Sequence, residues 1–564
     1  MKKNDWPVIV GINRTQDASI SVFIGGKHEV SIHKERITRK KHHWGELSDL
    51  VLYKNFLPVL NRPIDLIVEC FSSDEELKND ELYEQDIYDN LLLNDNFKRI
   101  KISHHLAHSY SAFPVSGFPA AAGLIVDFQG SHKKNFTETG NFDAIPENYL
   151  EVASYYHSDR KDCKCIKKQM WDGNISRPTG LGAFYNRLSK CFFTGDANEG
   201  KVMGLCGYGN SKNVKLPGLV FMDGEILIPD EWLQLFAEPG IYSFEKSSRT
   251  FQEKADLAAK GQLEFEKGLL KMVDWLHKRT RSSNLYYAGG CALNVLANTR
   301  ILQESKFKKL FIPPAPHDGG TSIGCALYGL MNVYGMKPEF AWENDYLGPV
   351  HPAGDIENII GNYPDLILAR PADLVSECAD RLAEGQILAL FQERSEFGPR
   401  ALGNRSIIAD GRFSITRDWI NLTIKGREWY RPIAPMIPEN EMEKYFQFKT
   451  ASRYMLFSPA INKLHRKNMG AITHVDGTSR LQTIAKKDND FVYRLLKRFK
   501  QKTGMPILTN TSFNLKGETI VETIDQAVES FSKKPFHALV IPPFLLTKKR
   551  PPVNPLQASE FLLC

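Results

Sequence analysis

The first part of the chain alternates short apolar runs with turn residues and then shows a longer helical repeat. Val8–Ile12 and Ala18–Ile24 have the β-branched content of strands, and Gly25-Gly26 predicts a tight turn into a third strand over 28–32. Apolar residues recur at helical spacing between Leu257 and Thr280, which predicts a helix. A meander of strands combined with helices indicates an α/β fold.

Two further predicted strands end in residues that suit ligand binding. Leu124–Asp127 is a short apolar run that ends in an acid, and the run that starts at Asn284 ends in Gly289-Gly290. Because α/β proteins bind ligands at strand ends, we expect chemistry at both positions.

The pattern changes near Tyr346, where Gly and Pro interrupt the chain. A new helix is predicted over 373–385 and a new strand over 387–392. We therefore place a domain boundary between about 340 and 370 and expect two α/β domains, 1–350 and 365–550.

Composition removes several classes of protein. The chain has 564 residues, and 72 Lys and Arg face 66 Asp and Glu, so a net charge of +6 argues against a nucleic-acid binder. Its nine Cys are dispersed, which indicates a reducing compartment. The longest apolar stretch, Phe113–Phe128, is broken by two Pro and two Gly, and the first residues lack the apolar core of a signal peptide. We expect a cytoplasmic protein without a membrane span.

A metal site is predicted from four residues. His104 and His108 are one helical turn apart, so both imidazoles lie on one face. Asp127 ends a buried strand, and Asp318 lies in a loop with two glycines. Two His and two carboxylates without a thiolate suit Fe²⁺, Mn²⁺ or Zn²⁺, and these alternatives stay open at this point.

The C-terminal part is rich in cations beside Gly, Pro and aromatic residues. Because Arg is suited to bidentate phosphate contacts, this pattern predicts an anion pocket rather than a salt-bridged surface. The segment Glu199-Gly-Lys201 has two equally supported interpretations, a packed turn or one wall of an anion pocket. The segment Gly289-Gly290, which precedes Asn294, resembles an adenosine-binding turn. The residues that suggest the C-terminal pocket are Arg400, Arg405, Lys425, Arg427, Arg431, Arg480, Asn510 and Ser512.

Together, these motifs resemble the O-carbamoyltransferase family, whose members modify antibiotics and nodulation factors. The resemblance runs from about residue 8 to 545, and its two C-terminal motifs are specific in combination. The motifs are Asp17-Ala-Ser, Glu35-Arg-Ile-Thr-Arg-Lys40, His104-x-x-x-His108, Glu199-Gly-Lys-Val-Met-Gly204, Gly289-Gly-Cys-Ala-Leu-Asn294, Glu396-Phe-Gly-Pro-Arg-Ala-Leu-Gly-Asn-Arg-Ser406, His474-Val-Asp-Gly-Thr478 and Asn510-Thr-Ser-Phe-Asn514.

The resemblance implies an actin/sugar-kinase-like (ASKHA) first domain, similar to the tRNA threonylcarbamoyl-transfer protein, and a YrdC-like adenylating second domain. It implies that carbamoyl phosphate and ATP, the latter with Mg²⁺, form carbamoyl adenylate in the second domain. The first domain then passes the carbamoyl group to a hydroxyl of a small molecule, with Fe²⁺ favoured as its metal. A homodimer is left open.

The resemblance also assigns residues. His104, His108, Asp127 and Asp318 would hold the metal, and Gly289, Gly290, Asn294 and Lys201 would bind carbamoyl adenylate. Carbamoyl phosphate and ATP would bind Arg400, Lys425, Arg431, Arg480, Asn510 and Ser512.

The general base is where this chain departs from the family. Many relatives have His directly before the Asp that follows the first strand, whereas this chain has Gln16 before Asp17. Because Gln cannot act as a base, we assign the catalytic role to Asp17, His42 and Lys40, with His43 as an alternative.

Two other enzyme classes fit parts of the pattern. A small-molecule kinase of the ASKHA fold would explain Asp318-Gly-Gly-Thr but not the Arg-rich part. An enzyme of the tRNA-threonylcarbamoylation type is the second alternative. The nucleotide product separates carbamoyl transfer, which yields AMP, from a kinase, which yields ADP.

Overall fold

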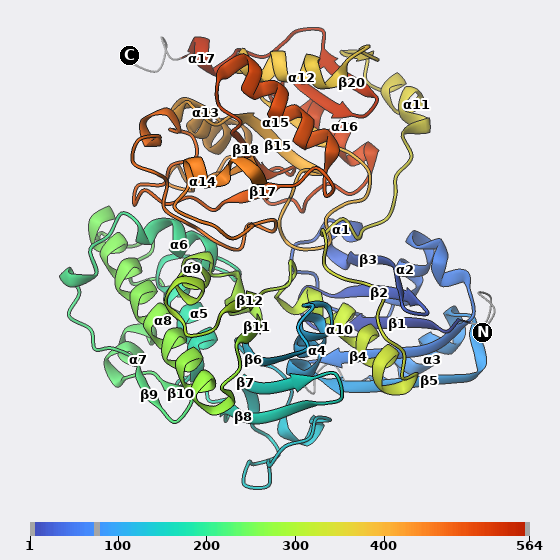
Figure 1. Cartoon of the computed structure of the whole chain (residues 1–564), viewed down its shortest axis with the longest axis vertical. Coiled ribbons are helices and arrows are strands. Elements are labelled where there is room, and N and C mark those ends of the chain that lie inside the picture. The colour runs from blue at the N-terminus through green and yellow to red at the C-terminus, as the bar shows by residue number, and fades with distance from the viewer. Residues whose placement is uncertain (1–5, 73–78, 559–564) are drawn as a thin grey trace. The chain divides into compact units, whose positions relative to one another are not determined.

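The computed structural model describes residues 6–72 and 79–558 (Figure 1). The chain forms two compact units that divide between Trp342 and Glu343, and the short segment Arg39–Lys41 groups with the second unit. Each unit contains sheets covered by helices, which confirms the predicted α/β class.

The first sheet begins with the predicted meander. β1 (Val8–Asn13), β2 (Ser19–Ile24) and β3 (Lys27–His33) pair antiparallel in succession. β4 (Ile64–Phe71) and β5 (Leu93–Ser103) then add in parallel on the other side of β1. The resulting order is β3-β2-β1-β4-β5.

The second sheet of this unit repeats that arrangement. β6 (Ala120–Val126), β7 (Leu150–Asp159) and β8 (Cys163–Trp171) form an antiparallel meander. β11 (Asn284–Ala288) and β12 (Lys309–Phe311) add in parallel beside β6. The first unit therefore contains one topology twice.

Helices and a small hairpin complete the first unit. The predicted helix over 257–280 begins earlier, because Thr250 and Glu253 form a reciprocal capping box at its start. The elements are α1 Lys34–Thr38, α2 Asp49–Phe56, α3 Asp80–Asn90, α4 His104–Ala112, α5 Gly180–Phe192, α6 Glu199–Cys206, β9 Val220–Met222, β10 Glu225–Leu227, α7 Asp230–Phe236, α8 Phe251–Thr280, α9 Val295–Glu304 and α10 Thr321–Tyr328.

Helix α10 packs closely against both α4 and β1 (Figure 1). A Cβ on Gly324 would lie 1.9 Å from the carbonyl oxygen of Ala107 in α4, and a Cβ on Gly11 would lie 1.9 Å from the carbonyl oxygen of Ser322 in α10. Glycine is required at both positions, since any side chain would push the backbones apart. This packing fixes α4 in the centre of the unit.

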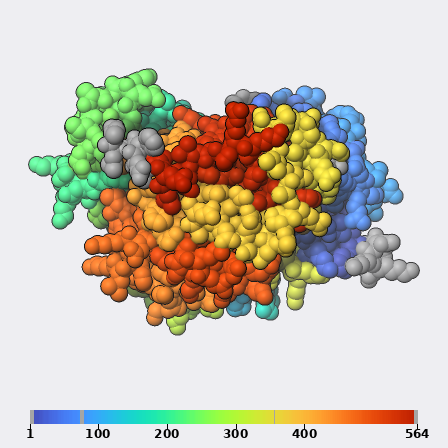
Figure 2. Space-filling view, turned by 90° about the horizontal axis from the view of Figure 1, so that it is seen from above, coloured from blue at the N-terminus to red at the C-terminus, as the bar shows by residue number. Residues whose placement is uncertain are grey.

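The second unit is built on one eight-stranded sheet in the order β13-β20-β19-β14-β15-β18-β16-β17. Its first and last segments are interleaved, and Figure 2 shows the yellow and red parts of the chain side by side. The strands are β13 Leu366–Ala369, β14 Leu388–Phe391, β15 Arg405–Asp410, β16 Ala434–Pro438, β17 Gln482–Ile484, β18 Leu508–Ser512, β19 Ala538–Ile541 and β20 Phe544–Lys548.

Both faces of this sheet are covered. Leu388 and Leu390 point into a core with α12 and α15, whereas Ala389 and Phe391 belong to a second core with α16, as the alternation of a strand requires. The helices are α11 Ile356–Gly361, α12 Leu374–Ala383, α13 Ser414–Trp419, α14 Met442–Tyr445, α15 Asp490–Thr503, α16 Ile524–Lys533 and α17 Pro555–Ala558.

Among the described residues, no helix combines the length and the apolar character needed to cross a bilayer. The cytoplasmic location and the homodimer stay predictions.

The close contact between α4 and α10 predicts a strong effect of one methyl group. Gly324→Ala should lower the melting temperature of the first unit, because the added carbon meets backbone atoms and overpacking costs about 1–3 kcal/mol. This cost exceeds the gain of about 1 kcal/mol from better helix propensity. Scanning calorimetry measures the effect. Gly200→Ala, on α6 of the same unit, is the control, since a Cβ there meets nothing within 4 Å, and equal melting of both variants would contradict the packing argument.

Candidate functional site

The four predicted metal ligands meet in the first unit. His104 and His108 lie on α4, which begins directly after β5. Asp127 follows β6, and Asp318 begins the turn before α10. One ligand atom from each of the four residues lies within 4.8 Å of the others, and the two imidazoles are fully buried.

The side chains of this cluster point at one another. The Nε2 atoms of His104 and His108 are 3.1 Å apart. His108 Nε2 is 3.3 Å from Asp127 Oδ2, and His104 Nε2 is 3.4 Å from Asp318 Oδ1. Two imidazoles and two carboxylates fit a divalent transition metal by donor chemistry. The four side chains could hold such an ion, and its identity stays a prediction.

Surrounding groups fix the two carboxylates. Asp127 accepts hydrogen bonds from the backbone N–H groups of Phe128 and Gly290, at 2.7 and 2.9 Å. Asp318 Oδ2 accepts from the Thr15 hydroxyl at 2.9 Å. Such outer contacts orient metal ligands and raise metal affinity.

The imidazoles and the carboxylates of this cluster shift one another's pKa values towards opposite charges. Burial alone would lower the pKa of His104, but the Asp318 carboxylate raises it well above the usual value. Burial alone would raise the pKa of Asp318, but His104 and His108 lower it well below the usual value. The pocket thus favours positive charge between its carboxylates.

The predicted adenylate-binding turn adjoins this cluster. Gly289 has φ +93°, and a Cβ there would lie 2.3 Å from the Val126 carbonyl oxygen. Its neighbour Gly290 donates to Asp127, so the two glycines lie beside a predicted metal ligand.

Asn294 and Lys201 have contacts within the fold. Asn294 caps α9 and exchanges two amide hydrogen bonds with Gln262, at 3.0 and 3.1 Å. Lys201 lies on α6 with its ammonium 4.9 Å from the centre of the Phe193 ring. Their roles as adenylate ligands stay predictions.

A second polar group forms around Asp17. The Asp17 residue has φ +58°, and its Oδ1 is 2.8 Å from His42 Nδ1. Burial alone would raise the pKa of Asp17, but the hydrogen bond with His42 and the charge of His317 lower it. His317, whose Nε2 is 3.9 Å from Asp17 Oδ2, directly precedes Asp318. The Asp17 group therefore adjoins the metal cluster.

The other two residues predicted for the catalytic role, Lys40 and His43, do not join the Asp17–His42 pair. Lys40 is exposed and forms no hydrogen bond or ion pair among the described residues. His43 is engaged with the Thr38 hydroxyl at 2.8 Å. Glu35 and His317 were not among the residues predicted for the general-base site. Glu35 nevertheless accepts a hydrogen bond from the His42 backbone N–H at 3.1 Å. The motif that begins at Glu35 could have indicated this residue, and the position of His317 directly before Asp318 could have indicated the other.

Four guanidinium groups cluster in the second unit. Burial, together with the charge of Arg431, lowers the pKa of Arg400 to about 10 and that of Arg427 to about 9. Burial and the other three guanidiniums lower the pKa of Arg480. Within the described part of the chain, no carboxylate forms an ion pair with Arg400, Arg427 or Arg480. A cluster of this kind favours a polyanion.

Arg427 belongs to this cluster; the cation-rich pattern predicts it as a pocket residue, although the resemblance does not assign it to a ligand. Its Nε donates to the buried Asn421 Oδ1 at 2.8 Å, and Asn421 Nδ2 donates to the Arg431 carbonyl at 2.9 Å. Its Nη2 is buried without a partner among the described residues. The run of cations between Lys425 and Arg431 is the sequence signal that indicates it.

The side chains of Lys425 and Ser512 form hydrogen bonds with neighbouring groups of the second unit. The Lys425 ammonium donates to the carbonyl oxygens of Ser512 and Asn514 at 2.8 and 2.9 Å and to Asn514 Oδ1 at 2.6 Å. The Ser512 hydroxyl donates to the same Asn514 oxygen at 2.6 Å. Burial, with the neighbouring Arg427, lowers the pKa of Lys425. Direct contact of Lys425 and Ser512 with a ligand stays a prediction.

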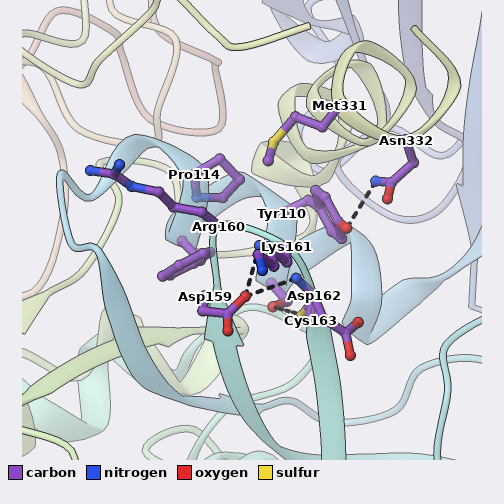
Figure 3. A pocket seen from close by; sticks show the side chains of 11 residues that line it. Tyr110, Pro114, Asp159, Arg160, Lys161, Asp162, Cys163, Met331 and Asn332 are labelled. Carbon is purple, nitrogen blue, oxygen red and sulfur yellow. Dashed lines mark hydrogen bonds between the residues drawn. The ribbon is translucent and has the colours of Figure 1, made fainter. Parts of the chain in front are cut away.

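A small cavity lies at the C-terminal end of α4 and the turn between β7 and β8 (Figure 3). Its lining includes Tyr110, Arg160 and Asn332, and Asn332 donates to the Tyr110 hydroxyl at 2.8 Å. A volume of about 60 Å³ admits a few water molecules and is below the range of ligand sites. None of the predicted site residues lines it.

Comparison with known proteins matches two family models. Residues 77–327 match the carbamoyltransferase N-terminus, and residues 379–548 match the carbamoyltransferase C-terminus. Nodulation protein NolO of Bradyrhizobium diazoefficiens is 31% identical over 477 residues, which are 79% of this chain and 79% of that protein.

A relative with a named reaction matches a shorter part of the chain. The 3′-hydroxymethylcephem-O-carbamoyltransferase of Streptomyces clavuligerus is 35% identical over 245 residues, which are 43% of this chain and 45% of that protein. A solved structure of HypF from T. kodakarensis covers 59% of this chain and 48% of its own, with 13% identity and a TM-score of 0.39.

The cluster predicts metal binding that depends on His108 and, to a smaller extent, on Thr15. His108→Ala removes a ligand and should abolish stoichiometric metal. Thr15→Val removes only the hydroxyl that orients Asp318 and should weaken metal affinity by about 10- to 100-fold. Elemental analysis and competition with a chelator measure both. His105→Asn is the control, because the Nδ1 atom of His105 bonds the Ser154 hydroxyl instead. A wild-type protein without metal after loading with Fe²⁺, Mn²⁺ or Zn²⁺ would refute the assignment.

Proposed function

The chain belongs to the carbamoyltransferase family, and from this premise we propose that it is an ATP-dependent O-carbamoyltransferase acting on a hydroxyl of a small molecule. Carbamoyl phosphate and ATP would form carbamoyl adenylate in the second unit, and the first unit would transfer the carbamoyl group. The main support is the Arg cluster, whose charge calls for an anionic reactant.

Two fold assignments belong to this proposal. The repeated topology in the first unit supports an actin/sugar-kinase-like (ASKHA) domain over 1–350, since that fold contains two related halves. A YrdC-like domain over 365–550 is proposed from the family resemblance. The first domain would resemble the threonylcarbamoyl-transfer protein in its task.

The adenylation step gathers negative charge at one place. Carbamoyl phosphate, ATP and one water would give carbamoyl adenylate, phosphate and pyrophosphate, which balances all atoms. Arg400, Arg427, Arg431 and Arg480 would neutralise the phosphates of both reactants. Fixed cations in a poorly hydrated site lower the barrier where charge develops. Mg²⁺ would accompany ATP.

The transfer step needs a group that takes a proton from the acceptor hydroxyl. We assign this role to His42, because Asp17 holds its Nδ1 and orients the ring. As the oxygen of the acceptor attacks the carbamoyl carbon, the bond to AMP breaks and AMP leaves. Gly289 and Gly290 would let the adenylate approach the strand end closely.

A divalent ion held by His104, His108, Asp127 and Asp318 would polarise the carbamoyl group and stabilise the leaving phosphate. Asp127 is held by the N–H of Gly290 and Asp318 by Thr15, so the protein orients both carboxylates before any ligand arrives. We propose Fe²⁺, with Zn²⁺ and Mn²⁺ as alternatives.

The acceptor would be a hydroxylated natural product. This class is suggested by the hydroxymethylcephem acceptor in the name of the Streptomyces relative and by the nodulation relative NolO. If the protein were a kinase of the ASKHA fold, the Arg cluster in the second unit would have no functional explanation.

The proposed function is tested by its products. With carbamoyl phosphate, ATP and a panel of hydroxylated natural products, we expect AMP, pyrophosphate and a carbamate ester. Asp318→Asn should still release pyrophosphate but form no ester. Arg480→Ala should fail in the first step and recover ester formation when synthetic carbamoyl adenylate is supplied. Formation of ADP, or a requirement for tRNA, would refute the proposal in favour of the corresponding alternative.

A separate prediction concerns the base. His42→Gln should lower ester formation from synthetic carbamoyl adenylate by at least about 100-fold, the scale of general-base catalysis, while pyrophosphate release is unchanged. Rates of both steps at several pH values provide the measurement. His43→Gln is the matched control, since it removes a neighbouring imidazole that bonds Thr38. Equal losses of ester formation in both variants would indicate that transfer depends on the conformation of the segment that contains His42 and His43, rather than on the His42 imidazole.

A further inference from the structure

Glu151 is a buried carboxylate that the proposed mechanism does not use. It lies near the start of β7, and its side chain is fully buried. Its Oε1 accepts hydrogen bonds from the backbone N–H groups of His105, at 3.0 Å, and of Ser131, at 3.1 Å. Its Oε2 accepts from the ammonium of Lys168, which is also fully buried. Each oxygen therefore binds different partners, and all of these partners are donors.

The two backbone N–H groups belong to the segments that carry predicted metal ligands. His105 is the second residue of α4, the helix that carries both imidazole ligands. Ser131 lies four residues after Asp127, one of the two carboxylate ligands. One oxygen of Glu151 thus joins the start of the imidazole helix to the segment that follows a carboxylate ligand. Three of the four predicted ligands lie on these two segments.

Glu151 also caps α4 from a neighbouring strand. An α-helix begins with N–H groups that have no partner within the helix. Ser103, directly before α4, forms no capping hydrogen bond with its side chain among the described residues. The His105 N–H is bound by Glu151 instead, and the His104 N–H donates to Ser131 Oγ at 3.0 Å. The dipole of the helix further favours a negative charge at this end.

The approach of this carboxylate depends on Gly130. A Cβ there would lie 2.7 Å from Glu151 Cγ and 3.0 Å from His105 Cδ2. The main chain holds the same segment, because the Gly130 N–H donates to the Glu151 carbonyl at 2.7 Å. The Glu151 N–H in turn donates to the Ser131 carbonyl at 3.1 Å. The side chain and the main chain of Glu151 therefore act on one segment.

These contacts require a carboxylate. An ionised carboxylate presents two acceptor oxygens, whereas an amide of the same size presents one acceptor and one donor. Burial alone would lower the pKa of Lys168, but the carboxylates of Glu138 and Glu151 raise it above the usual value. Because hydrogen bonds from a charged donor are stronger, a glutamine would turn its oxygen to the Lys168 ammonium. Its NH₂ group would then face the two backbone N–H groups, which would lose their acceptor.

We propose that Glu151 is a positioning residue of the metal site. Its Oε1 holds the start of α4 against the segment that follows Asp127, and this contact sets the spacing of the ligands before an ion arrives. The inference rests on the metal site of the proposed function and adds a residue outside the four ligands. Outer contacts that orient metal ligands change metal affinity by about 10- to 100-fold.

Glu138 provides the competing explanation. Its side chain is equally buried, its Oε1 is 2.5 Å from Lys168 Nζ, and its Oε2 accepts from the Ser103 hydroxyl. Removal of either acid would therefore disturb the same buried charges. Near α4, however, Glu138 bonds a side-chain hydroxyl, whereas Glu151 bonds backbone N–H groups. Variants of the two acids should consequently differ in metal affinity.

The test is the Kd for Zn²⁺ of the full chain, stripped of metal and measured by competition with a chromophoric chelator. Glu151→Gln should raise the Kd by about 10- to 100-fold. Glu151→Asp retains the charge but withdraws both oxygens by one methylene, so it provides a second variant with the same expected effect.

Two variants serve as controls. Lys168→Met leaves both Glu151 oxygens available to the backbone N–H groups. It should lower the melting temperature, because it leaves buried carboxylates unpaired, but keep the Kd within about threefold of the wild type. Glu138→Gln should also keep the Kd within about threefold.

A spectroscopic measurement separates positioning from folding. The visible absorption bands of bound Co²⁺ report the number and arrangement of its ligands. We expect these bands to change in Glu151→Gln and to match the wild type in Lys168→Met and Glu138→Gln. A merely structural role would instead weaken Zn²⁺ binding in all three variants in proportion to their loss of melting temperature.

The outcomes also distinguish this inference from the proposed function. If Glu151→Gln binds Zn²⁺ as the wild type does, or if all three variants lose affinity equally, the inference is overturned and the metal site stands. If the wild type binds neither Zn²⁺ nor Co²⁺, the metal site is wrong, and the inference is wrong with it. None of these measurements uses a substrate, so a failure to detect carbamoyl transfer would refute the proposed function without changing their result.

Discussion

The attraction between two buried imidazoles and two carboxylates organises the first unit. Removing these groups from water is costly, and the cost is offset only where opposite charges meet at short distance. The chain meets this condition with a helix that begins directly at the end of β5, an acid directly after β6 and a glycine-containing turn before α10. The contacts of Gly11 and Gly324 bring the necessary backbones together. The repeated sheets thus serve to bring four side chains from distant segments to one point.

The second unit follows the opposite electrostatic principle. Arg400, Arg427 and Arg480 are held among cations without an acid that pairs with them in the described residues, and burial depresses their pKa values. An arrangement of this kind costs free energy in the absence of ligand. A ligand that binds only the folded state returns part of that free energy, so polyphosphate binding should stabilise this unit. Asn421 shows how the arrangement is maintained, because one buried amide bonds both the Arg427 side chain and the Arg431 backbone.

Local sequence predicted the meander of β1 to β3, the long helix α8 and the strands that precede Asp127 and Gly289, because each depends on spacing within one segment. The meeting of His104 and His108 with Asp127 and Asp318 was expected from the donor chemistry. Other features depend on contacts across the sequence and had no local signal. Asn294 is paired with Gln262, and Lys425 is occupied by Asn514, so residues that resemble ligands in the sequence are engaged within the protein. The long helix also begins before its first apolar repeat, since a capping box rather than hydrophobicity sets its start.

The two electrostatic environments explain why the proposed chemistry needs two units. Phosphates of ATP and carbamoyl phosphate require several cations close together, and such a cluster would repel a divalent ion that is not carried by the nucleotide's own phosphates. Carbamoyl transfer requires carboxylates that attract such an ion and a paired base, Asp17 with His42, and these groups would repel a polyphosphate. A carboxylate close enough to ligate the ion would also pair with a nearby guanidinium, and each pair would remove one group from each task. Placing the guanidinium cluster and the acid–imidazole cluster in separate folding units, each with its own core, keeps both sets of charges available.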